Sequence, residues 1–265
     1  MDDLHPSPPP PHAILLAAGK GTRMNSDLPK VMLEVADRPM LRWVLDACFE
    51  AGVQRCFVVV GHRASDVQQA FADEPRCTFV EQSPQLGTAH AVEMTRPHFR
   101  ELPPGDVFVL AGDGPLIRAA TLKQLLQTHR ETGAAATLAT AVLDDPTGYG
   151  RIVRHAPQNT FARIVEQKDA DPDELLIREV NPSYYCFRRQ DLFAALQQIG
   201  NDNNQGEYYL TDAPGILRQQ GRPVELVDAV PADDVLSINT PHQLAAVDRL
   251  LRQRLASTPA VGAHP

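Results

Sequence analysis

Over the first half of the chain, short apolar runs alternate with longer segments in which apolar residues recur every three or four positions. The apolar runs are rich in β-branched and aromatic residues and are bounded by turn residues, which predicts buried strands. These runs cover residues 13–18, 56–61, 77–82 and 107–113. Repeated strand–helix–strand units of this kind predict a mainly parallel sheet with helices on both faces. Ligands bind to such sheets beyond the carboxyl ends of the strands.

Amphipathic segments between these runs predict the helices. Residues 39–52 form the clearest case, because one face of that helix is apolar and Gly52 is a typical residue at a helix end. The apolar face consists of Met40, Leu41, Val44, Leu45 and Cys48. Shorter helices are expected at residues 65–73 and 87–99. Together with the strands, these helices indicate an α/β, Rossmann-like fold.

From about residue 136 onward, strand patterns follow one another with fewer helices between them. The predicted strands cover residues 135–143, 150–155, 162–168, 179–187 and 224–230. We expect them to add strands to the sheet and to form a small β-rich lid on one side of a cleft.

The last regular element is a helix that begins at the sequence T-P-H-Q. Thr240 can cap it, Pro241 suits the first helical position, and Gln243 completes a capping box. Its apolar stripe consists of Leu244, Val247, Leu250, Leu251 and Leu255.

Composition narrows the functional classes. The chain has 265 residues, of which 43% are hydrophobic, enough to bury a substantial core. We expect a disordered proline-rich leader, one folded domain and a flexible tail, over residues 1–12, 13–256 and 257–265.

A net charge of −8 argues against binding to nucleic acids or anionic membranes. No apolar run approaches the roughly 18 residues of a membrane span. The leader lacks the features of a signal peptide and the cysteines form no C-x-x-C pair, so we expect a reduced, cytoplasmic protein.

The loop after the first predicted strand, residues 16–30, is rich in small and basic residues and predicts an anion site. Its basic residues are Lys20, Arg23 and Lys30. It is not a Walker A loop, because Gly21 stands where Ser or Thr is required, and Met24 replaces the third glycine of the dinucleotide fingerprint. Exposed backbone N–H groups, an arginine fork and a lysine suit a small polyanion on an otherwise acidic protein. The alternative is an ordinary glycine-rich turn with solvated basic side chains.

Asp113 follows the strand predicted at 107–113, where a buried carboxylate is costly unless it lies at a cleft or beside a cation. Mg²⁺ prefers oxygen ligands and is commonly bound by one or two protein groups together with substrate phosphates. Asp113 is therefore a candidate metal ligand, and the alternative is a carboxylate that caps a turn. Further candidate loops lie at 81–91, 144–152 and 165–170.

Taken in order, these segments closely resemble the N-terminal uridyltransferase domain of the bacterial bifunctional N-acetylglucosamine-1-phosphate uridyltransferase / glucosamine-1-phosphate acetyltransferase. The sequence LAAGKGTRM…LPK is shared broadly by sugar nucleotidyltransferases. The sequences DDPTGYGRI, VEQKDA and QGEYYLTD are far more specific to this family. The resemblance extends from about Ala13 to about Leu255.

The resemblance implies a set of site residues. Those expected to bind the nucleotide are Leu16, Ala17, Ala18, Gly19, Gln82, Gly87, Thr88 and Gly112. Arg23 and Lys30 would neutralise the triphosphate. The expected Mg²⁺ ligands are Asp113 and Asn239. The residues expected to contact the sugar are Gly150, Glu166 and Asn181.

The implied reaction forms UDP-N-acetylglucosamine and pyrophosphate from UTP and N-acetylglucosamine 1-phosphate. The phosphate oxygen of the sugar attacks the α-phosphorus in line, so the chemistry needs positioning and charge stabilisation rather than a nucleophilic side chain. This accounts for a candidate site of Arg, Lys and a metal ion.

The sequence departs from the family pattern at three points. Ala111 stands where many members have an aromatic residue, and Asn181-Pro182-Ser183 replaces the usual N-T-G. Pro182 removes a backbone donor and restricts Asn181 to extended geometry. The β-helix half that transfers acetyl groups is absent, so we expect a monomer that does not acetylate glucosamine 1-phosphate. The alternatives are a relative that uses another sugar phosphate or base, and a non-catalytic sensor, which the presence of both candidate metal ligands disfavours.

Overall fold

The computed structural model describes residues 8–19, 21, 24, 26–228, 230–236 and 238–257. Its central element is a seven-stranded sheet in the order β13-β7-β12-β6-β1-β4-β5. The strands are β1 (His12–Ala17), β4 (Cys56–Val60), β5 (Cys77–Glu81), β6 (Asp106–Ala111), β7 (Ala136–Ala139), β12 (Tyr184–Arg188) and β13 (Val224–Val227). The four strands predicted in the first half of the chain are confirmed, with small differences at their ends.

The sheet is parallel except at one strand. β1 runs parallel to both β4 and β6, whereas β12 is antiparallel to its neighbours β6 and β7. Leu16 of β1 lies opposite Val59 of β4 and Ala111 of β6. The carboxyl ends of these three strands therefore meet at one edge, where a site is expected in such a fold.

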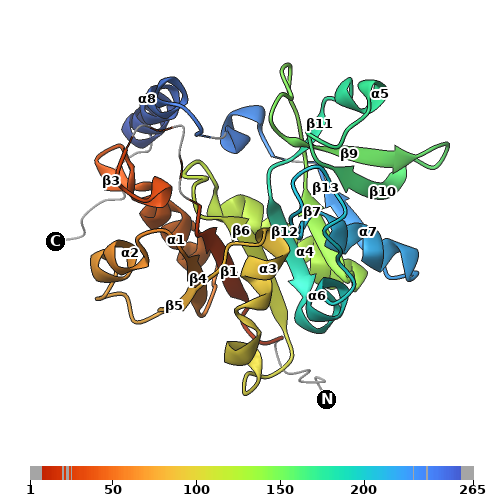
Figure 1. The fold of residues 1–265 in the computed structure, drawn as a ribbon, viewed down its shortest axis with the longest axis horizontal. Coiled ribbons are helices and arrows are strands. Elements are labelled where there is room, and N and C mark those ends of the chain that lie inside the picture. The colour runs from red at the N-terminus through yellow and green to blue at the C-terminus, as the bar shows by residue number, and fades with distance from the viewer. Residues whose placement is uncertain are drawn as a thin grey trace, which may run out of the picture.

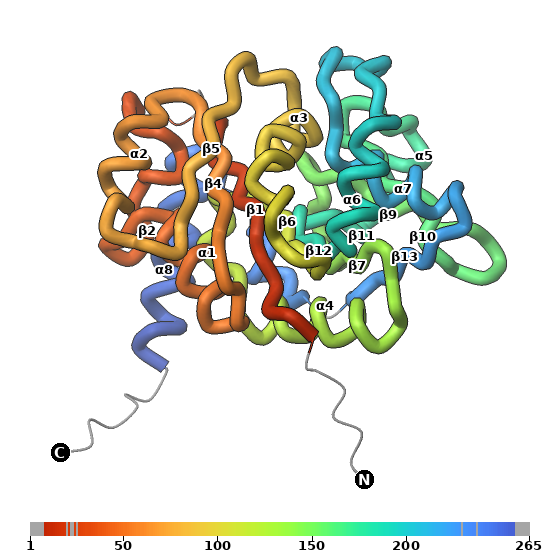
Figure 2. The backbone as a smooth tube through the Cα atoms, turned by 90° about the horizontal axis from the view of Figure 1, so that it is seen from below, coloured from red at the N-terminus to blue at the C-terminus, as the bar shows by residue number. Residues whose placement is uncertain are grey.

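Helices cover both faces of the sheet, which confirms the α/β, Rossmann-like fold with a mainly parallel sheet (Figure 2). One face packs against α1 (Met40–Glu50), α2 (Ala64–Ala70) and α4 (Ala119–Thr132). The other face packs against α3 (Thr88–Glu93), α6 (Arg189–Leu196) and α7 (Asp212–Gln219). The five apolar positions predicted on one face of α1 are all fully buried.

The sequence pattern was less accurate for the other helices. The helix expected at 87–99 is two elements, α3 and the 3₁₀ turn Arg96–Phe99. Pro97 accounts for the break, because a proline lacks the N–H of a continuing helix and clashes with the preceding turn. The pattern did not predict α4, α6 or α7.

A second, four-stranded antiparallel sheet forms the lid in the order β10-β9-β11-β8, visible in green beside the main sheet (Figure 1). Its elements are β8 (Ala141–Val142), β9 (Gly150–His155), β10 (Thr160–Val165), α5 (Pro172–Leu175) and β11 (Glu179–Asn181). The single strands predicted at 135–143 and 179–187 are wrong, because each segment contributes one strand to each sheet. Between β11 and β12 the chain passes from the lid sheet to the main sheet. There Pro182 cannot donate a hydrogen bond to a neighbouring strand, and Ser183 has a left-handed backbone with φ of 63°.

The last helix, α8 (Pro241–Ser257), packs on the hairpin formed by β2 (Glu34–Val35) and β3 (Arg38–Pro39). Thr240 caps α8 as predicted, because its hydroxyl accepts the N–H of Gln243 at 3.2 Å. The Gln243 side chain accepts the N–H of Asn239 at 2.8 Å, one residue earlier than a capping box requires. The predicted apolar stripe is wrong at Leu255, which is 48% exposed. No helix in the described part of the chain combines the length and the apolarity of a membrane span.

Candidate active site

Two cavities lie at the edge where the strands of the main sheet end, one beside the opening loop and one beneath the lid. The first, which we call the β1 cavity, has a volume of about 410 Å³. The second, the lid cavity, has a volume of about 190 Å³. Ala111, Asp113 and Ser183 line both, so the two cavities meet at these residues.

The structure brings most of the sequence-predicted site residues to these cavities. The β1 cavity is lined by the predicted nucleotide residues Leu16, Ala17, Ala18, Gly19, Gln82, Gly87 and Thr88 and by Lys30. The lid cavity is lined by the predicted sugar residues Gly150, Glu166 and Asn181 and by Asn239. The grouping inferred from the resemblance therefore matches the division into two cavities.

Of the remaining predicted residues, Gly112 lines neither cavity. Arg23 lies outside the residues that the structure describes. Gly112 donates its N–H to the Leu16 carbonyl at 2.9 Å, and an added Cβ would lie 2.9 Å from that same oxygen. The close approach of the Gly112 and Leu16 backbones explains why this position is a glycine. A direct contact of Gly112 with the nucleotide stays a prediction.

A lysine joins the two candidate metal ligands. The Nζ atom of Lys30 lies 2.5 Å from Asp113 Oδ2 and donates to Asn239 Oδ1 at 3.0 Å. These residues come from the segment after β1, the turn after β6 and the segment just before α8, so only the folded chain brings them together. Two oxygen atoms therefore surround one cationic position, and the carboxylate and amide oxygens are the ligand types that Mg²⁺ prefers. Among the described residues, no group of three or more His, Cys, Asp or Glu could hold a metal ion.

One wall of the β1 cavity is a turn held by distant backbone. Gly87 has φ of 113°, and a Cβ there would lie 2.5 Å from the Tyr208 carbonyl oxygen, so only glycine fits. The N–H of Tyr208 donates to Leu86 and the N–H of Leu210 donates to the Thr88 hydroxyl, both at 2.9 Å. The sequence QGEYYLTD thus shapes the cavity wall by binding the loop that contains Gly87.

Gln82 lies behind this turn and is 5% exposed. Its Nε2 donates to the Gly87 carbonyl at 2.9 Å and lies 3.0 Å from His90 Nδ1. The side chain therefore has protein partners on its nitrogen side while the residue lines the cavity.

In the lid cavity, Asn181 is also held by protein partners. Its Nδ2 donates to the Tyr185 hydroxyl at 2.6 Å, and its Oδ1 accepts the N–H of Ser183 at 3.1 Å. Burial raises the pKa of Tyr185, so the phenol stays protonated. Asn181 ends strand β11 in extended geometry, as the following Pro182 predicts.

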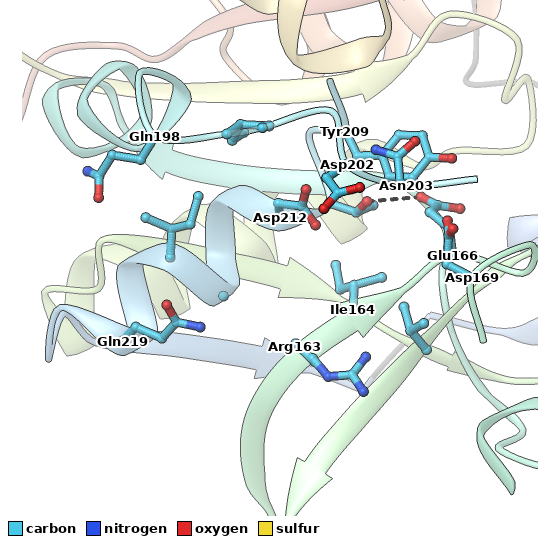
Figure 3. Close-up of a pocket in the computed structure, with 16 residues that line it drawn as sticks. Arg163, Ile164, Glu166, Asp169, Gln198, Asp202, Asn203, Tyr209, Asp212 and Gln219 are labelled. Atoms are coloured by element: carbon cyan, nitrogen blue, oxygen red, sulfur yellow. Dashed lines mark hydrogen bonds between the residues drawn. The ribbon is translucent and has the colours of Figure 1, made fainter. Parts of the chain in front are cut away.

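Glu166 lies between the lid cavity and a further, acidic cavity of about 480 Å³, shown in Figure 3. Its Oε1 accepts a hydrogen bond from the Thr211 hydroxyl at 3.0 Å. Burial raises the pKa of Glu166, and nearby carboxylates, Asp169 first among them, raise it further. Glu166 is thus a partly buried acceptor whose orientation depends on Thr211, the residue before α7.

Sequence reasoning missed the group that fixes the far wall of the lid cavity. Asp234 is 1% exposed and forms ion pairs with Arg118 (Nε–Oδ2, 2.6 Å) and Arg254. The hydroxyls of Tyr149 and Tyr184 donate to the carbonyls of Val235 at 2.8 Å and of Asp234 at 3.1 Å. No pattern in the sequence marks this network, because Arg118 lies 116 positions from Asp234 and the other members come from separate parts of the chain.

The comparisons with known proteins agree with this arrangement. A family model described as MobA-like NTP transferase domain matches residues 13–213. The chain belongs to this family. The transferase has the fold of a solved UDP-glucose pyrophosphorylase complexed with UDP-glucose, with a TM-score of 0.72 and 16% identity over 92% of this chain and 98% of that one.

Curated relatives are closer in sequence. The transferase is 49% identical over 243 residues to the "Bifunctional protein GlmU" of Heliobacterium modesticaldum, and 44% identical over 244 residues to that of Geobacillus thermodenitrificans. Each match covers 92% of this chain and 52% of the relative, so the chain spans about half the length of these relatives. The resemblance to one half of a bifunctional bacterial protein is therefore confirmed.

Proposed function

We propose that this transferase forms UDP-N-acetylglucosamine and pyrophosphate from UTP and N-acetylglucosamine 1-phosphate. The observation that carries the proposal is that the β1 cavity and the lid cavity meet at Asp113, next to the cationic group of Lys30. A nucleoside triphosphate in the first cavity and a sugar phosphate in the second would bring their phosphates to this junction. The relatives that match over 92% of the chain support the choice of reaction.

In this reaction an oxygen of the sugar 1-phosphate forms a bond to the α-phosphorus of UTP, and the bond to the pyrophosphate oxygen breaks. Lys30 would stabilise the negative charge on the phosphates, and Arg23 would add a planar fork for their oxygens. No side chain needs to act as a nucleophile. The residues of this chain would therefore act by positioning and by charge.

Nucleotidyltransferases of this family generally use a divalent metal ion. We propose Mg²⁺ bound by the oxygens of Asp113 and Asn239, which already converge on one cation, the Lys30 ammonium. When bound, the ion would neutralise phosphate charge and polarise the reacting phosphate. Lys30 would then contact phosphate rather than these two side chains.

The sugar would be selected in the lid cavity. Gly150 packs closely against Ile164, because an added Cβ would lie 3.0 Å from that side chain, while the partly buried Glu166 and the buried Asn181 offer polar atoms to the cavity. A second candidate function is uridyl transfer to another hexose phosphate. The Asn181-Pro182-Ser183 sequence favours this alternative, because it changes the backbone donors beside the sugar.

The test is pyrophosphate release by the purified protein with Mg²⁺ and a panel of nucleotides and sugar phosphates. The proposal requires the highest kcat/KM with UTP and N-acetylglucosamine 1-phosphate. A higher value with another sugar phosphate would support the alternative, and the absence of pyrophosphate release with every substrate pair would overturn both.

Because UTP is a cytoplasmic metabolite, we expect the protein to work in the cytoplasm. We also propose a monomer, which light scattering on the same preparation would test.

A further inference from the structure

The amide of Gln82 has only one orientation that satisfies its surroundings. The Gly87 carbonyl, 2.9 Å away, can accept a hydrogen bond but cannot donate one, so the amide nitrogen of Gln82 must face it. The same nitrogen lies 3.0 Å from His90 Nδ1. A flipped amide would place its oxygen against the lone pairs of the Gly87 carbonyl.

This orientation decides which ring nitrogen of a neutral His90 carries the proton. Since the Gln82 nitrogen is a donor, His90 Nδ1 must be the acceptor, and the ring proton of the neutral imidazole must be on Nε2. Both amide hydrogens of Gln82 are then used by protein acceptors, Gly87 and His90. Only the carbonyl oxygen Oε1 is left to face a ligand from this residue.

We propose that His90 is a positioning residue that sets the base specificity of the β1 cavity through Gln82. An acceptor fixed in the cavity wall selects a base that presents a ring N–H, such as N3–H of uracil. It rejects bases that present a ring nitrogen lone pair at that edge, such as N3 of cytosine or N1 of adenine. This inference rests on the proposed use of a nucleoside triphosphate and names the residue that selects its base.

The geometry supports an indirect role for His90. It is on α3 and does not line the cavity, whereas Gln82 does. With the Gly87 carbonyl as the only acceptor, a flipped Gln82 amide would lose one hydrogen bond. With His90 Nδ1 as a second acceptor, the flipped amide would lose two. A histidine that donated from Nδ1 would instead favour the flipped amide, in which an N–H group faces the base and uracil is no longer matched.

The experiment compares kcat/KM for UTP and CTP, with N-acetylglucosamine 1-phosphate as the second substrate, for the wild type and two variants. His90→Leu removes the acceptor, whereas the side-chain oxygen of His90→Asn supplies an acceptor near the position of Nδ1. We expect the UTP-to-CTP ratio to fall about tenfold in His90→Leu, the scale of one hydrogen bond, and to be largely restored in His90→Asn. The expected change is in KM for UTP rather than in kcat, since His90 does not contact the reacting phosphates.

An unchanged ratio in a folded His90→Leu variant, with an active wild type, would overturn the inference and leave the proposed function intact. An inactive wild type would instead count against the proposed function. The tautomer of His90 can be measured in the wild-type protein, so this second test does not depend on whether a variant folds. In wild-type protein with ¹⁵N-labelled histidine, the nitrogen shifts of His90 must correspond to a proton on Nε2, and a proton on Nδ1 at neutral pH would also overturn the inference.

Discussion

The two halves of the candidate site are built in different ways. The β1 cavity is walled mainly by backbone and small residues, from Leu16 to Gly19 and at Gly87, at the ends of parallel strands. The lid cavity has polar side chains at the ends of short antiparallel strands, and two of these side chains are each held by another side chain. Asn181 is bonded to Tyr185, and Glu166 to Thr211.

In the β1 cavity the sheet determines where the lining residues lie, whereas in the lid cavity hydrogen bonds determine how the side chains are oriented. In the parallel sheet, the register of β1, β4 and β6 alone brings the strand ends together, so a loop at one end is in place once the sheet forms. In the lid, a side chain points correctly only if its hydrogen-bond partner is present. Substitutions where the two cavities meet should therefore affect turnover most, and those in the lid should change which sugar is used.

The largest expected effect is at Asp113, which belongs to both cavities. Asp113→Ala removes a metal ligand and should lower kcat by about 10² to 10³, the usual cost of one preorganised electrostatic group. Pyrophosphate release measures it. Asp73→Ala, which removes an exposed carboxylate elsewhere, is the control. More than a third of wild-type activity in an Asp113→Ala protein with normal melting would show that the two cavities do not share a metal site.

The next effect concerns Lys30, which binds the same two oxygens as the proposed metal ion. Lys30→Met should lower kcat/KM for UTP by about 10², because a charge on the phosphates is lost. It should also tighten the binding of Mn²⁺ to the free protein, since the competing ammonium is gone. Titration calorimetry measures the second effect. Weaker Mn²⁺ binding in the variant would mean that Lys30 does not occupy the metal position.

In the lid, Glu166→Gln should change sugar selection more than turnover. The partly buried carboxylate is expected to accept hydrogen bonds from the sugar, so the preference for N-acetylglucosamine 1-phosphate over glucose 1-phosphate should change about tenfold. Thr211→Val removes only the hydroxyl that orients Glu166 and should change the same ratio by less. Equal kcat/KM for both sugar phosphates in the wild type would leave the lid without a role in selection.

The sequence predicted residues at strand ends better than the side chains that orient them. Strand-end residues such as Asp113 are readable because a buried run that ends in a carboxylate is a local pattern. The partners Tyr185, Thr211 and Asp234 could not be found, because they act through tertiary contacts with no local spacing. The split of residues 179–187 between two sheets was missed although Pro182 was noticed, since strand-like residues on both sides of a proline are compatible with one interrupted strand or with two.

The smallest effect tests the crossing between the two regions. Ser183 has φ of 63°, a left-handed backbone that glycine adopts without the steric cost that a Cβ brings. Its hydroxyl also interacts with Tyr185, so Ser183→Gly alone would mix two effects. Ser183→Ala removes the hydroxyl and keeps the Cβ, and its difference from Ser183→Gly isolates the backbone.

We expect the glycine variant to be more stable than the alanine variant by about 1 kcal/mol, because alanine at positive φ is strained. For a chain of this size, that difference corresponds to a Tm higher by roughly 2–4 °C. Thermal unfolding of the two variants under identical conditions measures it. If the alanine variant melts at or above the temperature of the glycine variant, the backbone at Ser183 is not held in the left-handed region. The junction of the main sheet and the lid would then be free to relax, contrary to the rigid crossing that the lid cavity requires.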